Sequence, residues 1–205
     1  MTTEIHKGET YRWTIRPETS TLVYVPISTI SLTAPVQLVT ATAHGMPDGW
    51  RFAVTGVKGL TQLNAAVDKE TFLPADSDYF LGVVVDPNTI KIDHVNATQF
   101  PAYTSGGVLQ YFLPMNLNAC SIRAQIRTKT RASTLMIDLT PYATMSIPLC
   151  RFDFTVPATI TSAVVGDEGV LGVEIIDGSG AVMTLPNEDI VFLKELARSR
   201  EEFSA

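Results

Sequence analysis

The sequence is poor in several features that mark common protein classes. It has only two cysteines, Cys120 and Cys150, which are too few for a disulfide framework. We expect both to be reduced, small core residues of a protein that folds in cytoplasm, with a single bridge between them as the alternative. No apolar run approaches the roughly 18 residues that cross a bilayer, and the first residues lack the apolar segment of a signal peptide. The sequence therefore predicts no membrane partner.

Clustered positive charge is also missing. The formal net charge is −6, the pI is near 5.0, and the 15 basic residues are scattered. Because phosphate binding needs grouped Lys and Arg, nucleic acid is not an expected partner. Three separated histidines and two distant cysteines give no zinc-like spacing, and the "DSD" of Asp76–Asp78 lacks the ligand ladder of a calcium loop. With no phosphate loop or dinucleotide fingerprint either, the expectation is no metal and no cofactor.

Strand patterns dominate what is present. Apolar and polar residues alternate in the segments 11–16, 120–127, 135–139 and 151–156, which is typical of strands with one buried face. "VLGVEIIDGSGAVMTL" reads as two strands around a glycine-rich hairpin turn. Residues 157–165 are a helix candidate, and residues 189–196 fit either a closing strand or a helix. The prediction is an all-β protein with an antiparallel sandwich and little helix.

The middle of the chain has a different sequence pattern. Short strands alternate with the turn clusters "HGMPDG", "PADSD", "DPN" and "TSGG", which favours a small β-barrel over residues 28–112. The segments 1–27 and 113–205 then form a discontinuous β-sandwich, since the strand at 11–16 needs partners that the later residues supply. We expect the segments 11–16 and 190–196 to be exposed sheet edges.

Particular motifs in this order resemble known phage proteins. His44–Gly45, "GVKGLTQLN" from Gly56, "DPNTIKIDHVN" from Asp86 and "AYTSGG" from Ala102 together resemble the small β-barrel of many phage tail proteins. That barrel is similar to the first catalytic-cysteine half-domain of ubiquitin-activating enzymes. No cysteine occurs between residues 28 and 113, so thioester chemistry is excluded there.

The flanking segments resemble a second phage fold. "KGETYRWTIRP", "MNLNACSIRAQIRTKTRASTLMIDLT" and "GVEIIDGSGAVMTL" look like the N-terminal β-sandwich of phage baseplate upper proteins. "NLNAC" departs from the Asp and Gly usual in that family, which leaves the turn there open. The resemblance implies a sandwich with a barrel inserted into it.

The segment "AYTSGG" raises the question of catalysis. A serine nucleophile needs a nearby base, and only His94 lies in the same predicted unit as Ser105. Ser105 precedes its glycines and does not stand in a G-x-S-x-G elbow. We interpret the segment as a turn in which glycine supplies positive φ, and we expect no enzyme; a hydrolase that uses Ser105 and His94 is the least favoured reading.

Aromatic residues suggest an interaction surface instead. Trp13 alternates with polar residues and fits a core position, whereas Phe72 and Tyr79 flank the turn "LPADSD". The predicted surface consists of Trp50, Phe72, Tyr79 and Tyr103.

The resulting hypothesis is a non-enzymatic structural component of a bacteriophage virion, in the tail, baseplate or neck. Its expected partners are other virion proteins and copies of itself in a ring. The alternative is a receptor- or carbohydrate-binding module of a tail fibre.

Overall fold

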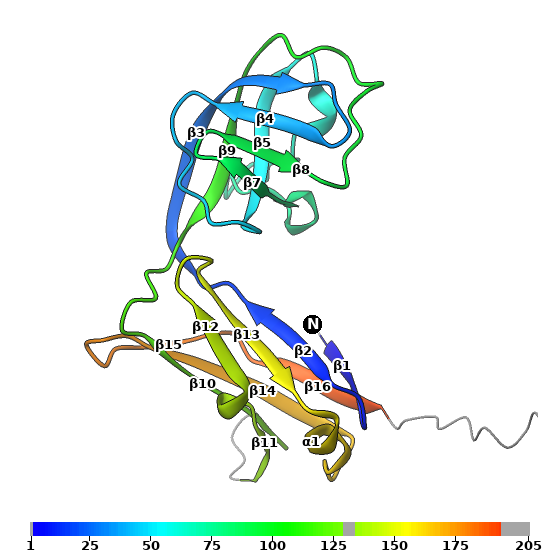
Figure 1. Ribbon diagram of the computed structural model, residues 1–205, viewed down its shortest axis with the longest axis vertical. Coiled ribbons are helices and arrows are strands. Elements are labelled where there is room, and N and C mark those ends of the chain that lie inside the picture. The colour runs from blue at the N-terminus through cyan, green and yellow to red at the C-terminus, as the bar shows by residue number, and fades with distance from the viewer. Residues whose placement is uncertain (1, 129–133, 194–205) are drawn as a thin grey trace, which may run out of the picture. The chain divides into compact units, whose positions relative to one another are not determined.

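The computed structural model describes residues 2–128 and 134–193, and these residues form two compact units. Unit 1 contains the described residues of Met1–Ile15, Asn116–Ile147 and Arg151–Ala205. Unit 2 contains Arg16–Met115 and Pro148–Cys150. Nearly all regular structure is strand (Figure 1), so the predicted all-β class is confirmed.

Unit 1 contains two sheets whose apolar faces form its core. The larger sheet has the order β1-β16-β14-β10-β11, with β15 also pairing with β14. Its strands are β1 (Thr2–His6), β10 (Ser121–Arg127), β11 (Leu135–Asp138), β14 (Glu168–Ile176), β15 (Val182–Thr184) and β16 (Glu188–Leu193). The smaller sheet has the order β12-β13-β2, from β2 (Tyr11–Ile15), β12 (Ala143–Ser146) and β13 (Arg151–Val156). The helix α1 (Ala158–Ser162) and the 3-10 turn η3 (Thr140–Tyr142) complete the unit.

In unit 1, the apolar residues that alternate with polar ones in the sequence are buried, as expected. Phe152, Phe154 and Val156 of β13 are buried, and so are Ala124 and Ile126 of β10. The "DGSG" hairpin is confirmed, since β14 and β15 pair from Glu174↔Thr184 to Ile176↔Val182. The helix candidate is also confirmed as α1. Neither cysteine forms a disulfide, and both are buried, as predicted.

Unit 2 is a single antiparallel sheet of seven strands that curls into a nearly closed barrel (Figure 1). The pairing order is β6-β5-β9-β3-β4-β8-β7. The strands are β3 (Glu18–Ser31), β4 (Val36–Thr40), β5 (Arg51–Lys58), β6 (Phe80–Leu81), β7 (Val83–Asp86), β8 (Thr89–Ile92) and β9 (Ser105–Pro114). Two 3-10 turns, η1 (Thr61–Leu63) and η2 (Asp76–Asp78), lie between β5 and β6.

A single glycine connects the two ends of this sheet. β6 and β7 are the first and last strands in the pairing order, and only Gly82 separates them in the chain. Gly82 donates its N–H to the carbonyl of Trp50 at 3.0 Å and accepts from the N–H of Gly49 at 2.9 Å. A Cβ at Gly82 would lie 2.8 Å from Phe52 Cε1 and 2.9 Å from Ile90 Cγ2, both on fully buried side chains. Only glycine lets the chain pass this close to the barrel core.

The unit boundaries differ from the predicted ones. The sequence placed the barrel at residues 28–112, whereas unit 2 begins at Arg16 and extends to Met115. The reason is that β3 runs unbroken from Glu18 and its first part pairs with β9, at Glu18↔Pro114 and from Leu22↔Phe112 to Pro26↔Val108. Pro148–Cys150 also belongs to unit 2, where the Cys150 thiol donates to the carbonyl of Met115 at 2.9 Å.

One of the two predicted edges is correct. Within residues 2–128 and 134–193, β2 pairs with β13 alone and is an end strand of its sheet, as expected for residues 11–16. The prediction for residues 190–196 is wrong as far as Leu193, because β16 pairs with β14 on one side and in parallel with β1 on the other. The pattern of residues 2–6 did not indicate that strand. Residues 194–196 lie outside the described residues.

The tight passage at Gly82 gives a stability prediction. Gly82→Ala forces a methyl group against Phe52 and Ile90, and overpacking of this kind costs roughly 1–3 kcal/mol. Chemical denaturation followed by circular dichroism should show the loss. The control Gly172→Ala, whose added methyl group finds its nearest neighbour at 3.7 Å, should unfold like the wild type. Equal stability of the two variants would contradict the role given to Gly82.

Candidate functional site

The residues predicted for an interaction surface occupy different environments within unit 2. Trp50 is 1% exposed, and its indole N–H donates to the carbonyl of Phe112 at 2.9 Å. Its predicted place on a surface is therefore wrong, because it lies in the barrel core. Tyr103 is half-buried, and its hydroxyl donates to the carbonyls of Gly106 and Ile27 at 2.9 and 3.2 Å. Tyr103 ties a loop to the barrel.

Phe72 stands out as an exposed aromatic residue. It is 69% exposed and has a φ of +59°, which is unusual for a bulky residue. It lies in the Phe72 loop, defined as residues 65–79. The chain turns there because the N–H of Phe72 donates to the carbonyl of Asp68, and the N–H of Asp68 donates to that of Leu73, both at 2.9 Å.

The carboxylate of Asp68 holds this turn. Its Oδ1 accepts from the N–H groups of Thr71 and Glu70 at 2.7 and 2.9 Å, and from the Thr71 hydroxyl at 3.0 Å. These bonds, that of the Thr71 N–H first, lower the pKa of Asp68 below 3.8. A folded-state pKa below the unfolded value means that ionisation stabilises the turn at neutral pH.

Tyr79 lies in a group of charged and aromatic side chains that the sequence reading did not identify. The Arg51 guanidinium stacks 4.8 Å from the centre of the Tyr79 ring. Arg51 also binds Glu18 through two hydrogen bonds of 2.6 and 2.7 Å, which raise its pKa. Burial raises the pKa of the Tyr79 phenol. Asp76 completes the group at 3.6 Å from Arg51.

Long-range strand pairing joins Phe72 to this group. The Gln110 amide donates to the Phe72 carbonyl at 3.5 Å, and Gln110 pairs with Tyr24 across β9 and β3. Tyr24 is 54% exposed and lies close enough to Tyr79 to influence its ionisation. Tyr79, Tyr24 and Arg51 thus lie near one another on the barrel, and the Phe72 backbone is bonded to the side chain that pairs with Tyr24 across the sheet. No local pattern marks Tyr24 or Arg51, because only the fold brings them together.

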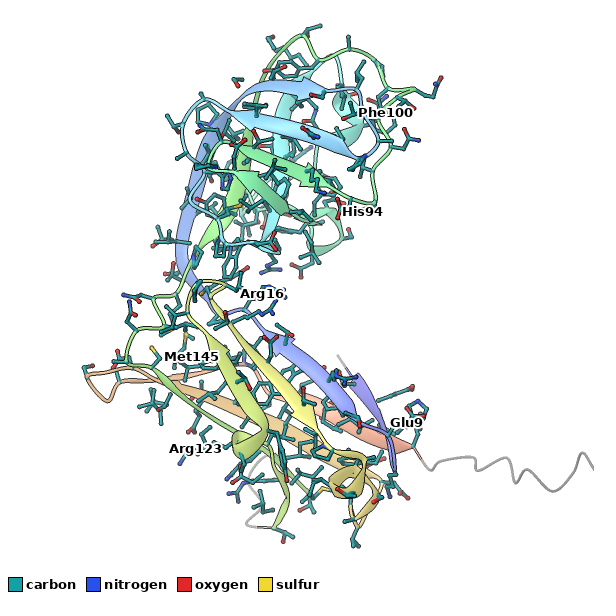
Figure 2. All side chains as sticks on the ribbon, viewed as in Figure 1. Glu9, Arg16, His94, Phe100, Arg123 and Met145 are labelled. Carbon is teal, nitrogen blue, oxygen red and sulfur yellow. The ribbon has the colours of Figure 1, made fainter. Side chains whose placement is uncertain are left out.

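The segment "AYTSGG" does not form a turn between strands, since Ser105 is the first residue of β9. The positive φ expected of its glycines is confirmed at +73° for Gly106 and +92° for Gly107. Among the described residues no hydrogen bond joins Ser105 to His94, and the centre of the His94 ring lies 6.0 Å from that of Phe80. Both His94, labelled in Figure 2, and Ser105 are exposed. The geometry provides no nucleophile–base pair at this serine.

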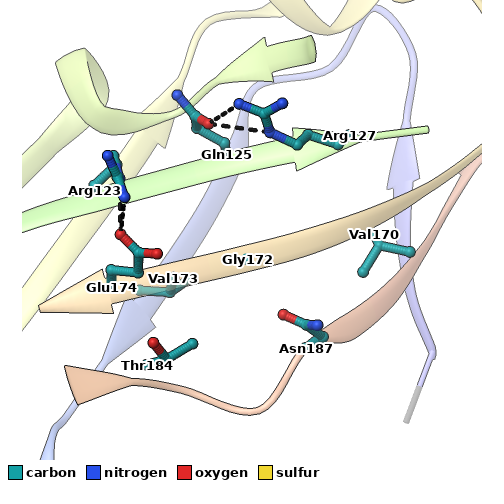
Figure 3. A pocket seen from close by; sticks show the side chains of 9 residues that line it. All are labelled: Arg123, Gln125, Arg127, Val170, Gly172, Val173, Glu174, Thr184 and Asn187. Carbon is teal, nitrogen blue, oxygen red and sulfur yellow. Dashed lines mark hydrogen bonds and ion pairs between the residues drawn. The ribbon is translucent and has the colours of Figure 1, made fainter. Parts of the chain in front are cut away.

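Unit 1 carries a polar hollow that the sequence reading missed. It lies on the outward face of β10 and β14, has a volume of about 330 Å³, and is called here the Gly172 groove (Figure 3). Its polar lining consists of Arg123, Gln125, Arg127, Glu174, Thr184 and Asn187. These side chains come from four segments, so the alternation of each strand showed only that they face away from the core.

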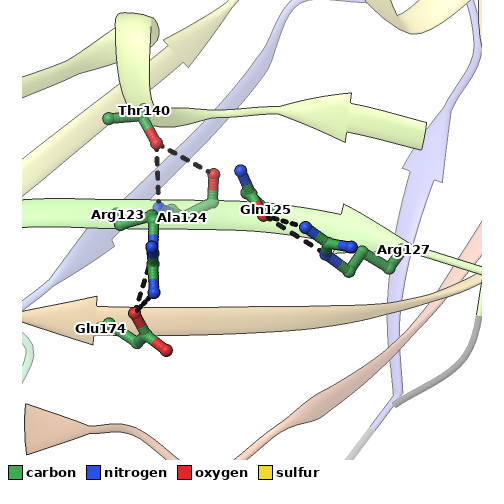
Figure 4. Close-up of polar contacts among 6 residues, drawn as sticks. All are labelled: Arg123, Ala124, Gln125, Arg127, Thr140 and Glu174. Carbon is green, nitrogen blue, oxygen red and sulfur yellow. Dashed lines mark hydrogen bonds and ion pairs between the residues drawn. The ribbon is translucent and has the colours of Figure 1, made fainter. Parts of the chain in front are cut away.

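Two arginines of the groove are oriented by neighbours. Arg123 donates from Nε and Nη2 to Glu174 Oε2, the former at 2.8 Å. Arg127 donates to Gln125 Oε1 from Nε at 3.3 Å and from Nη2 at 2.8 Å. Ala124 lies between them in the chain. Its N–H donates to the Thr140 hydroxyl at 3.1 Å, and that hydroxyl donates to the Ala124 carbonyl at 3.3 Å (Figure 4). Thr140 thereby fixes the strand that carries both guanidinium groups.

Comparisons with models of protein families and with curated proteins find no match to this chain. Within residues 2–128 and 134–193, no group of three or more His, Cys, Asp or Glu residues is placed to hold a metal ion. In the same ranges, no helix has the length and apolar character needed to cross a bilayer.

The Asp68 turn gives a pH prediction. As pH falls through the lowered pKa of Asp68, the carboxylate gains a proton, its acceptor strength drops and the Phe72 loop loosens. The amide signals of Glu70 and Thr71, followed by NMR, should titrate with a midpoint below 3.8. Asp68→Asn keeps an acceptor oxygen and should abolish this titration while preserving the turn. A midpoint above 3.8 in the wild type would contradict the assignment.

Proposed function

We propose that this chain is a non-enzymatic structural component of a bacteriophage virion that assembles with neighbouring copies and other virion proteins. The observation that carries the proposal is the contrast between the sheets of the two units. The seven-stranded sheet of unit 2 nearly closes on itself, whereas the three-stranded sheet of unit 1 ends in β2 and β12, each of which pairs on one side only among the residues that the structure describes. Strands paired on one side offer backbone groups to another chain.

Apolar side chains accompany one of these edges. Met145 of β12 and Ile147 just after it are 38% and 45% exposed, and Met145 is labelled in Figure 2. Exposed apolar groups beside unpaired strand backbone favour burial against a partner. The order of motifs that resembles phage tail barrels and baseplate sandwiches supports a virion as the setting. In a ring, one modest contact repeated by symmetry gives a stable assembly.

The proposal predicts that association depends on the β12 edge. Met145→Lys adds a charge that must be desolvated when another strand pairs there, which should weaken association about tenfold or more. Sedimentation or light scattering over a range of concentrations measures this. Val85→Lys replaces a residue of similar exposure (52%) in the barrel and should leave association unchanged.

The virion setting requires a separate test. Mass spectrometry of purified particles from a phage that encodes this chain should find it at a fixed ratio to the other structural proteins. A chain that stays monomeric at all concentrations and is absent from particles would contradict the proposal.

A second candidate, a receptor- or carbohydrate-binding module of a tail fibre, is favoured by the exposure of Phe72. A ring that is 69% exposed on a tightly held turn can contact a ligand at little cost in ordering. On this alternative, Phe72→Ala should abolish binding of particles to host cells and leave the oligomeric mass unchanged. Unimpaired cell binding by particles carrying Phe72→Ala would exclude it.

A further inference from the structure

The end strand β12 carries no charge of its own that would repel a second copy of this chain. No charged residue occurs between Asp138 and Arg151, a stretch that contains all of β12. β2, at the other end of the same sheet, carries the exposed Arg12. Natural strand edges are guarded against further pairing largely by charged side chains. Because the chain as a whole carries −6, two identical copies meet best where like charges do not face each other. The edge of β12 that does not face β13 meets this condition.

The strand behind β12 adds little charge to this edge. β13 places Asp153 opposite Thr144 and Arg151 opposite Ser146. These two charged side chains bind each other, since Arg151 Nε donates to Asp153 Oδ2 at 2.7 Å. Their opposite charges largely cancel for a neighbour that approaches β12.

The two faces of β12 differ in polarity. Ala143 and Met145 lie opposite Phe154 and Phe152, both 1% exposed, so they share the face that is directed to the core. The residues between and after them, Thr144 and Ser146, share the outer face with polar neighbours. A strand that extends this sheet must therefore place apolar residues on the core side and polar residues on the outer side. β12 of a second copy has this pattern.

The backbone of Met145 is directed to the open edge. In an antiparallel pair, alternate residues of a strand bond to the neighbouring strand and the residues between them point away from it. The N–H of Ala143 donates to the Thr140 carbonyl instead of to β13. Ala143 and Met145 therefore belong to the set that points away, whereas Thr144 and Ser146 face β13. The N–H and C=O of Met145 are thus offered to a partner strand.

A two-fold axis perpendicular to the sheet can satisfy both of these groups. It pairs β12 of two copies antiparallel and keeps their apolar sides on one face only if the axis passes through a residue. With the axis at Met145, its N–H and C=O bond to the C=O and N–H of Met145 in the second copy. With the axis at Thr144, Met145 would face Ala143, whose N–H is already bonded to Thr140, and the Met145 carbonyl would have no donor. The axis at Met145 is therefore favoured.

We propose that β12 pairs antiparallel with β12 of a second copy about a two-fold axis at Met145, which joins two three-stranded sheets into one continuous sheet. In this register, Thr144 of each copy lies opposite Ser146 of the other. The inference rests on the assembly role proposed above and specifies its partner, orientation and register. β2 remains open at both ends of the joined sheet for the further contacts of a larger assembly.

Disulfide cross-linking of the full chain tests this register. Thr144→Cys and Ser146→Cys replace small side chains on the outer face of β12. Residues directly opposite each other have Cα atoms about 4.5 Å apart, which a disulfide spans, whereas residues offset by two positions lie about 7–8 Å apart, beyond its reach. Mild oxidation should therefore cross-link a mixture of the two variants, and neither variant alone. The wild type, whose Cys120 and Cys150 are buried, controls for the native thiols.

The expected result is at least about tenfold more cross-linked dimer from the mixture than from either variant alone, because only the mixture places two thiols within disulfide reach. This product should be lost when both variants also carry Met145→Lys. Cross-linking of Thr144→Cys to itself, or to Thr14→Cys in β2 of another copy, would overturn the proposal. Association of the wild type without a cross-link in any mixture would overturn the two-fold pairing and leave the assembly role intact. A wild type that stays monomeric at all concentrations would overturn both.

Discussion

The requirement that strand backbone be hydrogen-bonded shapes both units of this protein. In unit 2 the requirement is met almost completely, because Gly82 joins the last strand of the sheet to the first and its own N–H and C=O bind Trp50 and Gly49. In unit 1 the larger sheet gains β1 on the far side of β16, yet the smaller sheet stops at β2 and β12. Unpaired strand backbone is costly to bury without a partner and is readily satisfied by one. This difference is why the proposed contacts between copies fall on unit 1.

The Phe72 loop and the Gly172 groove owe their shapes to backbone features and not to unusual side chains. The Phe72 loop presents an aromatic ring because Asp68 binds three donors and holds a left-handed residue in place. The Gly172 groove is hollow because the pairings of β15 and β16 leave out Gly172 and Val173 of β14, and the outward-facing one of the two is glycine. In both places a short-range interaction fixes the backbone, and side chains from distant segments then gather around it. Rigid presentation of this kind lowers the entropy that binding costs.

Local pattern predicted much of the fold. The alternation in β10 and β13, the "DGSG" hairpin, α1 and the positive φ of Gly106 and Gly107 all followed from residues next to one another in the chain. The predictions that were wrong concern features that depend on pairing between distant segments. Residues 18–26 belong to the barrel because Glu18 and Leu22–Pro26 pair with β9, and β16 is not an edge because β1 pairs with it. Trp50 reads as a surface aromatic beside a turn, but the barrel closes over it. The lining of the Gly172 groove comes from β10, β14, β15 and the segment before β16. For the same reason, the sequence could not predict that these side chains lie together.

Hydrogen exchange followed by mass spectrometry at increasing protein concentration tests the central claim most directly, because it reports on backbone pairing itself. If copies associate through the open sheet of unit 1, amides of β2 or β12 exchange more slowly as concentration rises, while amides of β3, β5 and β9 keep the same rates. Concentration-dependent protection confined to the barrel strands, or no protection in either unit as the mass of the assembly increases, would contradict the account.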